Sequence, residues 1–292
     1  MDERPRLPPN LALLISIIAV STASILIRWT DAPPLAIASY RMLISVAMLM
    51  PFFLRNKGIE KLRRQGKRQI INLLLVGIVL AIHFASWITS LSLTSVTSSV
   101  IFVHIDPIFV AIISHIFLNE KITKRTLSGI VISFIGVSVI AMGDAGTGES
   151  NLIGDALALT GGIMLGLYII GGRFYRKNLD LTTYVTPVYS MAAASLLLMS
   201  LVTETQLTGF SYSTYGFFFL IALIPMIFGH TLYNWALRYL SAPVVSLSLL
   251  GEPVGASILA FFLLGEVPPF FTIVGGGITL VGILISAYRS GT

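Results

Sequence analysis

Two acidic residues, each followed by proline, lie within apolar stretches of this chain. Asp106-Pro107 and Glu252-Pro253 are separated by 146 residues. Proline removes one backbone hydrogen bond from a helix, and inside a membrane the freed polar groups need a cavity or another partner. An acid at such a bend binds a substrate amine or carries a proton, unless it only caps the bend or pairs within it. Asp106 and Glu252 are therefore candidates for charge coupling, and the two prolines for shaping the backbone.

The spacing of 146 residues recurs beyond these pairs, which indicates an internal duplication. Glu120 returns as Glu266. The same offset pairs Leu91 with Leu237, Ser95 with Ser241, Leu118 with Leu264, Thr126 with Thr272, Gly129 with Gly275, and Gly136 with Gly282. Glu120 and Glu266 stand at helix ends, where a carboxylate accepts hydrogen bonds from the N–H groups that begin the next helix. We expect both to be structural.

Arg41 and all four histidines also fall in apolar stretches; the histidines are His83, His104, His115 and His230. Ionisable groups inside a membrane are costly, so each suggests a function. Arg41 is a candidate for charge coupling, and the alternative is a structural residue that pairs with an acid or with backbone carbonyls. We expect His104 to contact a substrate and His115 to lie at the membrane interface.

Aromatic and polar side chains share faces on two stretches related by the offset. His83 and Trp87 are four residues apart, so they lie on one helical face. Tyr233 occupies the position equivalent to Trp87, with Asn234 and Trp235 beside it. If one face lines a cavity, symmetry predicts that the other does too, with aromatic walls for an amphipathic substrate or its cation. The alternative is packing between helices. The candidate substrate-binding residues are His83, Trp87, His104, Tyr168, Tyr233, Asn234 and Trp235.

Composition limits the class of protein. Of the 292 residues 55% are hydrophobic and 11% charged, whereas a soluble domain has about 25% charged residues. The chain has no cysteine, which excludes disulfides and cysteine-ligated metals. Its net charge of +6 comes from basic residues in short loops, so it indicates membrane topology rather than nucleic-acid binding. Motifs of zinc proteases, P-loop pumps and serine hydrolases are absent, and the histidines lack metal spacing. We expect no enzyme activity, metal or cofactor.

About 20 apolar residues cross a bilayer, and ten stretches of this chain meet that criterion. They are residues 11–28, 35–54, 70–89, 95–118, 126–142, 152–172, 183–202, 214–237, 243–264 and 270–288. Lys and Arg collect in alternate loops, which places both termini in the cytoplasm. Five helices on each side of the repeat boundary then give two inverted repeats, residues 1–146 and 147–292, around a central cavity. The sequence thus predicts an all-α polytopic membrane protein.

The chain resembles the EamA-type members of the drug/metabolite transporter superfamily over nearly its whole length. The resemblance is carried by PLAIASYR from Pro34 to Arg41 and by the helix endings LNE at 118–120 and LGE at 264–266. A helix with two glycines seven residues apart follows each ending, although Asn119 stands where the family has glycine. The resemblance implies ten helices in two inverted repeats and export of small metabolites such as amino acids.

The expected function is therefore secondary active or facilitative export of amino acids or similar metabolites by alternating access, at the cell membrane. Two alternatives remain open: an intramembrane enzyme that uses a histidine with Asp106 on lipid-linked substrates, and a flippase for lipids or lipid-linked sugars. Small residues such as Gly129 and Gly275 permit close helix packing within each repeat, or a weak homodimer in place of a monomer.

Overall fold

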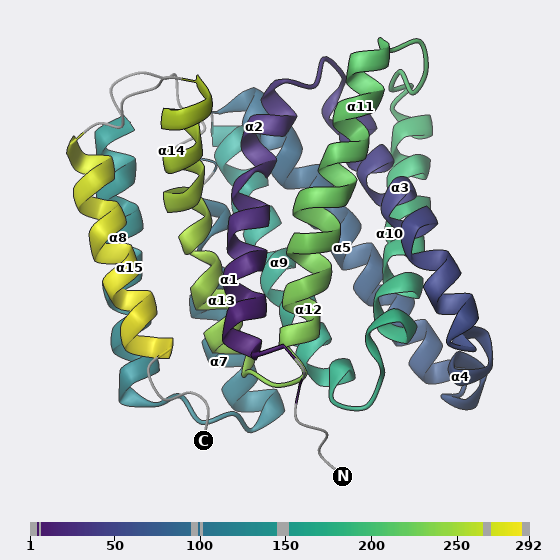
Figure 1. The fold of residues 1–292 in the computed structure, drawn as a ribbon, viewed down its shortest axis with the longest axis horizontal. Coiled ribbons are helices and arrows are strands. Elements are labelled where there is room, and N and C mark those ends of the chain that lie inside the picture. The colour runs from purple at the N-terminus through teal and green to yellow at the C-terminus, as the bar shows by residue number, and fades with distance from the viewer. Residues whose placement is uncertain are drawn as a thin grey trace.

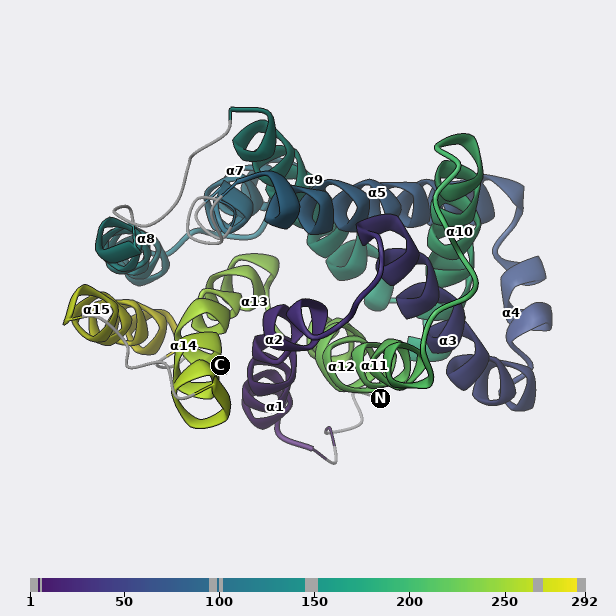
Figure 2. The same cartoon turned by 90° about the horizontal axis from the view of Figure 1, so that it is seen from above.

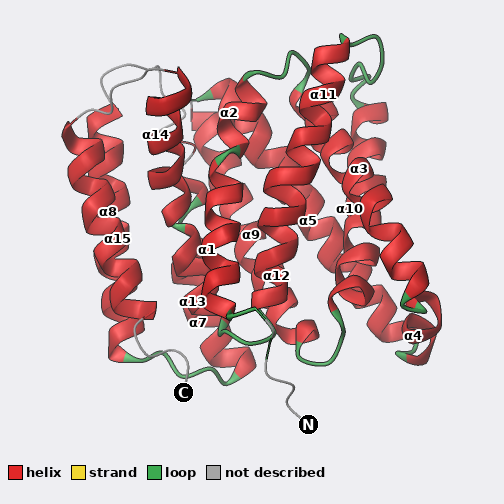
Figure 3. Ribbon diagram, viewed as in Figure 1, coloured by secondary structure: helices red, strands yellow, loops and turns green. Residues whose placement is uncertain are grey.

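The computed structural model describes residues 5, 7–94, 99, 102–144, 152–264 and 270–287, and helices are the only regular elements within them (Figure 3). The helices of the first half are α1 (Pro9–Ser21), α2 (Ala23–Arg28), α3 (Pro34–Arg55), α4 (Gly58–Arg64), α5 (Lys67–Leu93), α7 (Asp106–Leu118) and α8 (Lys124–Asp144). Those of the second half are α9 (Leu152–Arg176), α10 (Leu181–Val202), α11 (Tyr212–Ile221), the π-helix η1 (Ala222–Thr231), α12 (Leu232–Ala236), α13 (Ala242–Leu249), α14 (Gly251–Leu264) and α15 (Phe270–Ala287).

Seven helical spans among the described residues are long and apolar enough to cross a membrane. They include α3, α5, α9 and α10, whose bounds lie within a few residues of the stretches expected from hydropathy. Asp106–Leu118 and Ile273–Ser286 are apolar but shorter. The protein is therefore a polytopic, all-helical membrane protein, while the expected total of ten spans stays a prediction.

The sequence predicted that the acid–proline pairs bend helices near their middles. In the structure each pair instead lies at the start of a helix. Helix α7 starts at Asp106 with Pro107 in its first turn, and α14 starts at Gly251 directly before Glu252 and Pro253. The first helical turn has backbone N–H groups without intrahelical partners, so proline is tolerated there and an acid is favourable. Each pair thus lies at an interruption between helical segments within an apolar region.

Two further expected helices are also interrupted. The first expected span breaks between Ser21 and Ala23, where Thr22 closes α1. In the expected span 214–237, the backbone passes from α11 through η1, which contains Pro225, to α12. Proline cannot donate to the ladder, and π-type segments arise where the regular bonding pattern is disturbed, often at functional sites. The basic loop 55–68, expected as a connection, contains the short helix α4.

Seen along the helix axes (Figure 2), α5, α7 and α9 form one side of the molecule, and α1, α2, α11, α12 and α14 form the other. Helices α8 and α15 close one end, and α3, α4 and α10 the opposite end. The first turn of α1, the last turn of α15 and α4 lie at the lower end in Figure 1. Interruptions in α1–α2, η1 and α13–α14 therefore fall on the helices that face the α5–α9 side across the middle of the bundle.

Helices α8 and α15 pack on each other through small residues. A Cβ on Gly136 would lie 2.6 Å from the carbonyl oxygen of Gly275, and one on Gly129 would lie 2.7 Å from that of Gly282. Real side chains essentially never come this close, so only glycine allows the two backbones to approach in this way. The small residues thus join the two halves of the chain, and the expectation that they pack within each half was wrong.

Candidate functional site

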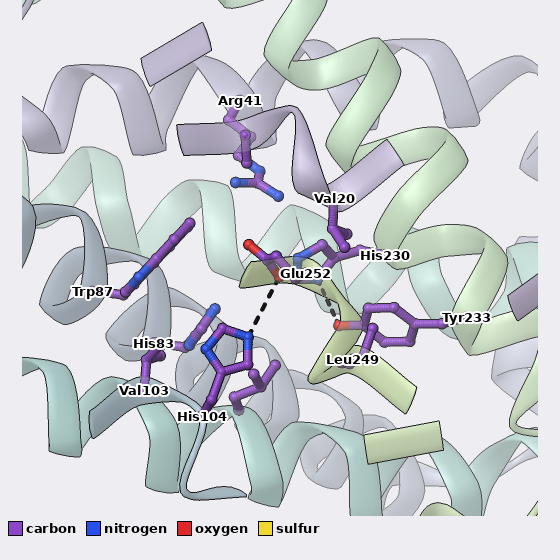
Figure 4. A pocket seen from close by; sticks show the side chains of 12 residues that line it. Val20, Arg41, His83, Trp87, Val103, His104, His230, Tyr233, Leu249 and Glu252 are labelled. Atoms are coloured by element: carbon purple, nitrogen blue, oxygen red, sulfur yellow. Dashed lines mark hydrogen bonds and ion pairs between the residues drawn. The ribbon is translucent and has the colours of Figure 1, made fainter. Parts of the chain in front are cut away.

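A pocket lies between the two sides of the bundle. Its lining comes from nine helices and the segment before α7: Val20, Ala23, Arg41, His83, Trp87, Val103, His104, Leu165, His230, Tyr233, Leu249 and Glu252 (Figure 4). Residues from the first and second halves face each other across this space. The pocket combines apolar, aromatic, imidazole and charged groups, as ligand sites do.

Arg41 supplies the positive charge of the pocket. It lies in α3, its side chain is 1% exposed, and its guanidinium carbon sits 4.2 Å from the centre of the Phe84 ring. Its Nε and Nη1 atoms have no hydrogen-bond partner, and no carboxylate among the described residues lies within ion-pair distance of it. In Figure 4 its guanidinium end is turned toward the pocket interior. A buried guanidinium with free donors is costly unless an anion completes it.

Glu252 supplies the negative charge, from the first turn of α14. Its Oε2 atom lies 3.8 Å from Nε2 of His104, and its side chain is 20% exposed. The contact is too long for a hydrogen bond, so the carboxylate keeps acceptor capacity for a cation in the pocket. His104 and Glu252 come from opposite halves of the chain, and each lies next to one of the interruptions at the starts of α7 and α14.

Imidazole and aromatic rings form the remaining polar wall. His83 donates from Nδ1 to the carbonyl oxygen of Gly161 at 2.9 Å, and its ring stacks on Trp87 with centroids 6.0 Å apart. On the facing helices the Tyr233 hydroxyl lies 2.6 Å from Nδ1 of His230. Both of the repeat-related faces expected from sequence, on α5 and on α12, therefore border the same pocket. The indole nitrogen of Trp87 is buried and has no partner.

Three of the seven expected substrate-binding residues do not line the pocket. Tyr168 and Asn234 are fully buried behind it, where the Asn234 amide donates to the Tyr168 hydroxyl at 2.7 Å and to the His230 carbonyl oxygen at 2.6 Å. Trp235 points elsewhere and packs on Tyr239, with ring centroids 4.8 Å apart. Adjacent helical positions differ in direction by about 100°, so neighbours of Tyr233 in sequence cannot share its face.

Asp106 also lies outside the pocket. Its side chain is fully buried, Ser246 of α13 donates a hydrogen bond to its Oδ2 atom, and its Oδ1 atom has no partner. The related acids at 106 and 252 thus have different surroundings: one is tied to a serine within the protein, and the other faces the pocket. The enzyme alternative required a histidine beside Asp106, whereas the histidine of this region, His104, approaches Glu252.

Sequence reasoning missed the apolar part of the lining, and it named His230 as a candidate functional group but not as a substrate-binding residue. Val20, Ala23, Val103, Leu165 and Leu249 give no signal in an apolar sequence, because the residues that face lipid have the same composition. His230 carried a usable signal, since it is an imidazole in an apolar stretch. Among the described residues no group of three His, Asp or Glu side chains is placed to hold a metal ion.

Glu120 connects three helices at the end of the bundle that carries α4. Its Oε1 atom accepts from Nε of Arg173 at 2.5 Å, and its Oε2 atom accepts from the backbone N–H of Ala242 at 3.0 Å. The expected partner was the following helix, α8; the helix whose N-terminus it caps is instead α13, in the other half. The preceding residue, Asn119, adopts φ 53°, so asparagine makes the left-handed turn that glycine usually makes. Glu266 lies outside the described residues.

A multi-helix membrane bundle around a buried pocket with opposed charges defines the class of protein: one that handles small solutes within a bilayer. The chain belongs to the EamA-like transporter family, which it matches twice, over residues 7–142 and 152–288. The family and the names of its relatives indicate transport and not catalysis.

Relatives and solved structures agree with this membership. The chain is 26% identical to the "Uncharacterized transporter YyaM" of Bacillus subtilis, over 87% of this chain and 84% of that protein. It is 25% identical to an "Uncharacterized transporter" of Archaeoglobus fulgidus, over 96% of both. It is 27% identical to a "Probable terminal-alkyne amino-acid exporter" of Streptantibioticus cattleyicolor, over 64% of this chain and 62% of that one. A crystal structure with 15% identity has the same fold, with a TM-score of 0.78 over 97% of both chains.

Proposed function

We propose that this protein is a secondary transporter that exports amino acids, or metabolites of similar size and charge, through the pocket between its two halves. One observation carries the proposal: Arg41 and Glu252 border the same pocket without an ion pair between them. An α-amino acid carries a carboxylate and an ammonium group, and these complement the two charges. The substrate side chain would then contact the apolar wall at Val20, Leu165 and Leu249.

Alternating access is supported by the contacts between α8 and α15. Gly129 meets Gly282, Ser133 meets Thr279, and Gly136 meets Gly275, so the two helices run antiparallel. Exchange of each residue for its counterpart 146 positions away maps this set of contacts onto itself. Such a pattern is what two inverted five-helix repeats, residues 1–146 and 147–292, would produce about a two-fold axis. The two halves could then exchange conformations and expose the pocket to either side.

The loop charges support an orientation of the protein in the membrane. The basic residues of α4 and its flanks lie at the same end as the start of α1 and the end of α15. Under the positive-inside rule this end faces the cytoplasm, in the cell membrane. Export agrees with the name of the relative from Streptantibioticus cattleyicolor, a "Probable terminal-alkyne amino-acid exporter". The protein would act as a monomer or a weak homodimer, since the small-residue faces of α8 and α15 are already used within the chain.

Glu252 is the better of the two candidates for proton coupling. A carboxylate that borders the pocket can bind either a proton or the substrate ammonium, and this competition would link the two fluxes. Asp106 has no such access, because it is buried and hydrogen-bonded to Ser246. If the exporter is driven by protons, Glu252 would carry the exchanged proton.

Efflux from proteoliposomes tests the proposal directly. Purified protein is reconstituted with a panel of radiolabelled amino acids inside, with and without a pH gradient. We expect efflux of at least one amino acid above that of protein-free liposomes, and loss of its pH dependence in Glu252→Gln. Absence of flux for every amino acid, together with flux of a labelled lipid, would favour the flippase alternative.

A further inference from the structure

A layer of buried polar side chains extends from the pocket to the end of the bundle that carries α4. It consists of Tyr168, Tyr184, Tyr189, Thr231 and Asn234, from α9, α10, η1 and α12, and we call it the polar seam. None of these side chains is more than 5% exposed. Such a concentration of phenol, hydroxyl and amide groups is unusual in the interior of a membrane protein, where polar groups are costly and commonly mark solute pathways.

The seam contacts the pocket at the end of the seam that lies away from α4. The Asn234 amide donates to the backbone carbonyl of the pocket residue His230 and to the hydroxyl of Tyr168. Tyr168 donates in turn to Tyr189 at 3.5 Å, and the Tyr189 hydroxyl lies 3.2 Å from Oγ1 of Thr231. A nearly continuous set of polar contacts therefore leads away from the pocket wall.

Helix α9 shows the direction of the seam. Leu165 borders the pocket, and Tyr168, Gly172 and Arg176 follow at helical spacing along the same side of the helix. From Leu165 to Arg176 the helix rises about 16 Å. Arg176 is 1% exposed and donates from Nε to the carbonyl oxygen of Asn234 at 3.0 Å. The guanidinium of Arg176 thus lies at the end of the seam away from the pocket, and the guanidinium of Arg41 lies at the pocket.

The seam is incompletely satisfied in this conformation. The Tyr184 hydroxyl and Oδ1 of Asn234 are buried without hydrogen-bond partners. Both converge on Gly172, since a Cβ there would lie 2.8 Å from Asn234 Oδ1 and 3.5 Å from the Tyr184 hydroxyl. A structural polar cluster is expected to satisfy its members, because each orphaned group weakens the fold. Separation of α9, α10 and α12 would instead give these groups water or a solute as partners.

We propose that the polar seam is a transit site on the cytoplasmic side of the pocket, which opens in the alternate conformation and conducts carboxylate-bearing polar solutes past Asn234 and Tyr184. Arg176 meets the carboxylate at the entrance, and the phenol and amide groups replace its hydration shell on the way to Arg41. The inference rests on the proposed transport through the pocket. It adds the route, and it explains why orphaned polar atoms persist where apolar side chains would stabilise the closed state.

Thiol labelling tests the seam without knowledge of the substrate, because the natural chain contains no cysteine. Asn234→Cys and Tyr184→Cys each introduce one thiol into the seam, and the second keeps the test valid if the first does not fold. Ala192→Cys is the matched control, since Ala192 is equally buried in α10 but lies against Gly77 of α5. A membrane-impermeant maleimide is applied to right-side-out and inverted vesicles.

We expect the seam thiols to react at least tenfold faster than the control thiol, and only from the side that α4 faces. Equal protection of seam and control thiols, or reaction only from the opposite side, would overturn the proposal. Labelling of the seam without efflux of any amino acid would instead refute the proposed substrate and leave the route standing.

A second measurement separates transit from structure. Tyr184→Phe removes an orphaned hydroxyl, so it should raise the melting temperature while it slows labelling of Asn234→Cys severalfold. Tyr175→Phe is its control, because Tyr175 stacks beside Tyr184 but contributes no orphaned atom. A seam that served only for packing would show the higher melting temperature with no change in labelling.

Discussion

Ser133 and Thr279, which are 146 residues apart, face each other across the contact between α8 and α15. The Ser133 hydroxyl donates to the Thr279 carbonyl oxygen at 3.1 Å, and the Thr279 hydroxyl, which donates to the Gly275 carbonyl oxygen at 2.9 Å, lies 3.5 Å from the Ser133 carbonyl oxygen. The glycines on both sides of this pair bring the backbones close enough for this contact.

Gly282→Ala should weaken this contact. The added Cβ would lie 2.6 Å from the Ser133 backbone nitrogen and 2.7 Å from the Gly129 carbonyl oxygen, so the helices must separate. We expect a loss of about 1–3 kcal/mol, as for other overpacked sites. Thermal unfolding in detergent measures it. Gly277→Ala on the same helix is the control, because its Cβ would meet nothing within 4 Å. Equal melting temperatures for the two variants would contradict the role assigned to Gly282.

Glu120→Ala should destabilise the end of the bundle that carries α4. The change removes the Glu120 carboxylate, which is 10% exposed and pairs with Arg173. It also leaves the Ala242 N–H without its acceptor. Loss of one partner from a buried pair costs about 3 kcal/mol. Glu60→Ala removes a carboxylate from the exposed pair with Arg64, where less than about 1 kcal/mol is expected. Denaturation of both variants in matched detergent compares them, and similar losses would refute the bridging role of Glu120.

The stability contributed by Asp180 should depend on pH. Partial burial alone raises the pKa of its carboxyl, but the hydrogen bonds from Lys61, Thr182 and Thr183 outweigh it and lower the pKa from 3.8 to about 2. A depressed pKa stabilises the folded protein above pH 4, and this contribution disappears as the pH falls from about 4 toward 2.

Asp180→Ala is the corresponding variant. At neutral pH it should cost about 1 kcal/mol, since Asp180 caps α10 through the Thr183 N–H. The gap in melting temperature between wild type and variant should narrow between pH 4 and pH 2. Asp31→Ala, at an exposed position, serves as the control. A gap that stays constant over this range would argue against the charged form as the capping species.

Arg41→Gln should weaken binding of amino acids by roughly tenfold or more, since a charge-assisted hydrogen bond contributes about 1.5–3 kcal/mol. Affinity for the decarboxylated amine of the same substrate should change little, because that ligand leaves Arg41 unused. Calorimetric titration of both ligands gives the comparison. Arg64→Gln, on an exposed side chain, controls for net charge. Equal losses for acid and amine would show that Arg41 shapes the pocket and does not bind carboxylate.

Helix positions followed from composition because a membrane helix requires about 20 consecutive apolar residues. Helices α3, α9 and α10 begin and end within a few residues of the expected bounds. The interruptions before Asp106 and Glu252 could not be placed in this way, because residues on both sides of each break are apolar. Proline indicated a disturbed helix near these positions, but not that a new helix would start there.

Candidate residues for the pocket were predicted where an ionisable group or an i, i+4 pair stood out, as with Arg41, Glu252, His83 and Trp87. Tyr168 and Asn234 were correctly singled out as unusual, but they lie in the polar seam behind the pocket. Helices that are apolar all round give no periodic signal of the side that faces the interior.

The sequence by itself determined that this is a helical membrane protein with a repeated pattern of acids, prolines and glycines, because lipid exposure and close packing restrict residue types strongly. Only the tertiary structure decided which of two equivalent acids meets the pocket. Asp106 and Glu252 each precede a proline at positions 146 residues apart, but the rotation of α7 and α14 about their axes turns the first toward Ser246 and the second toward His104. That rotation is set by packing among helices distant in sequence, which local pattern does not encode.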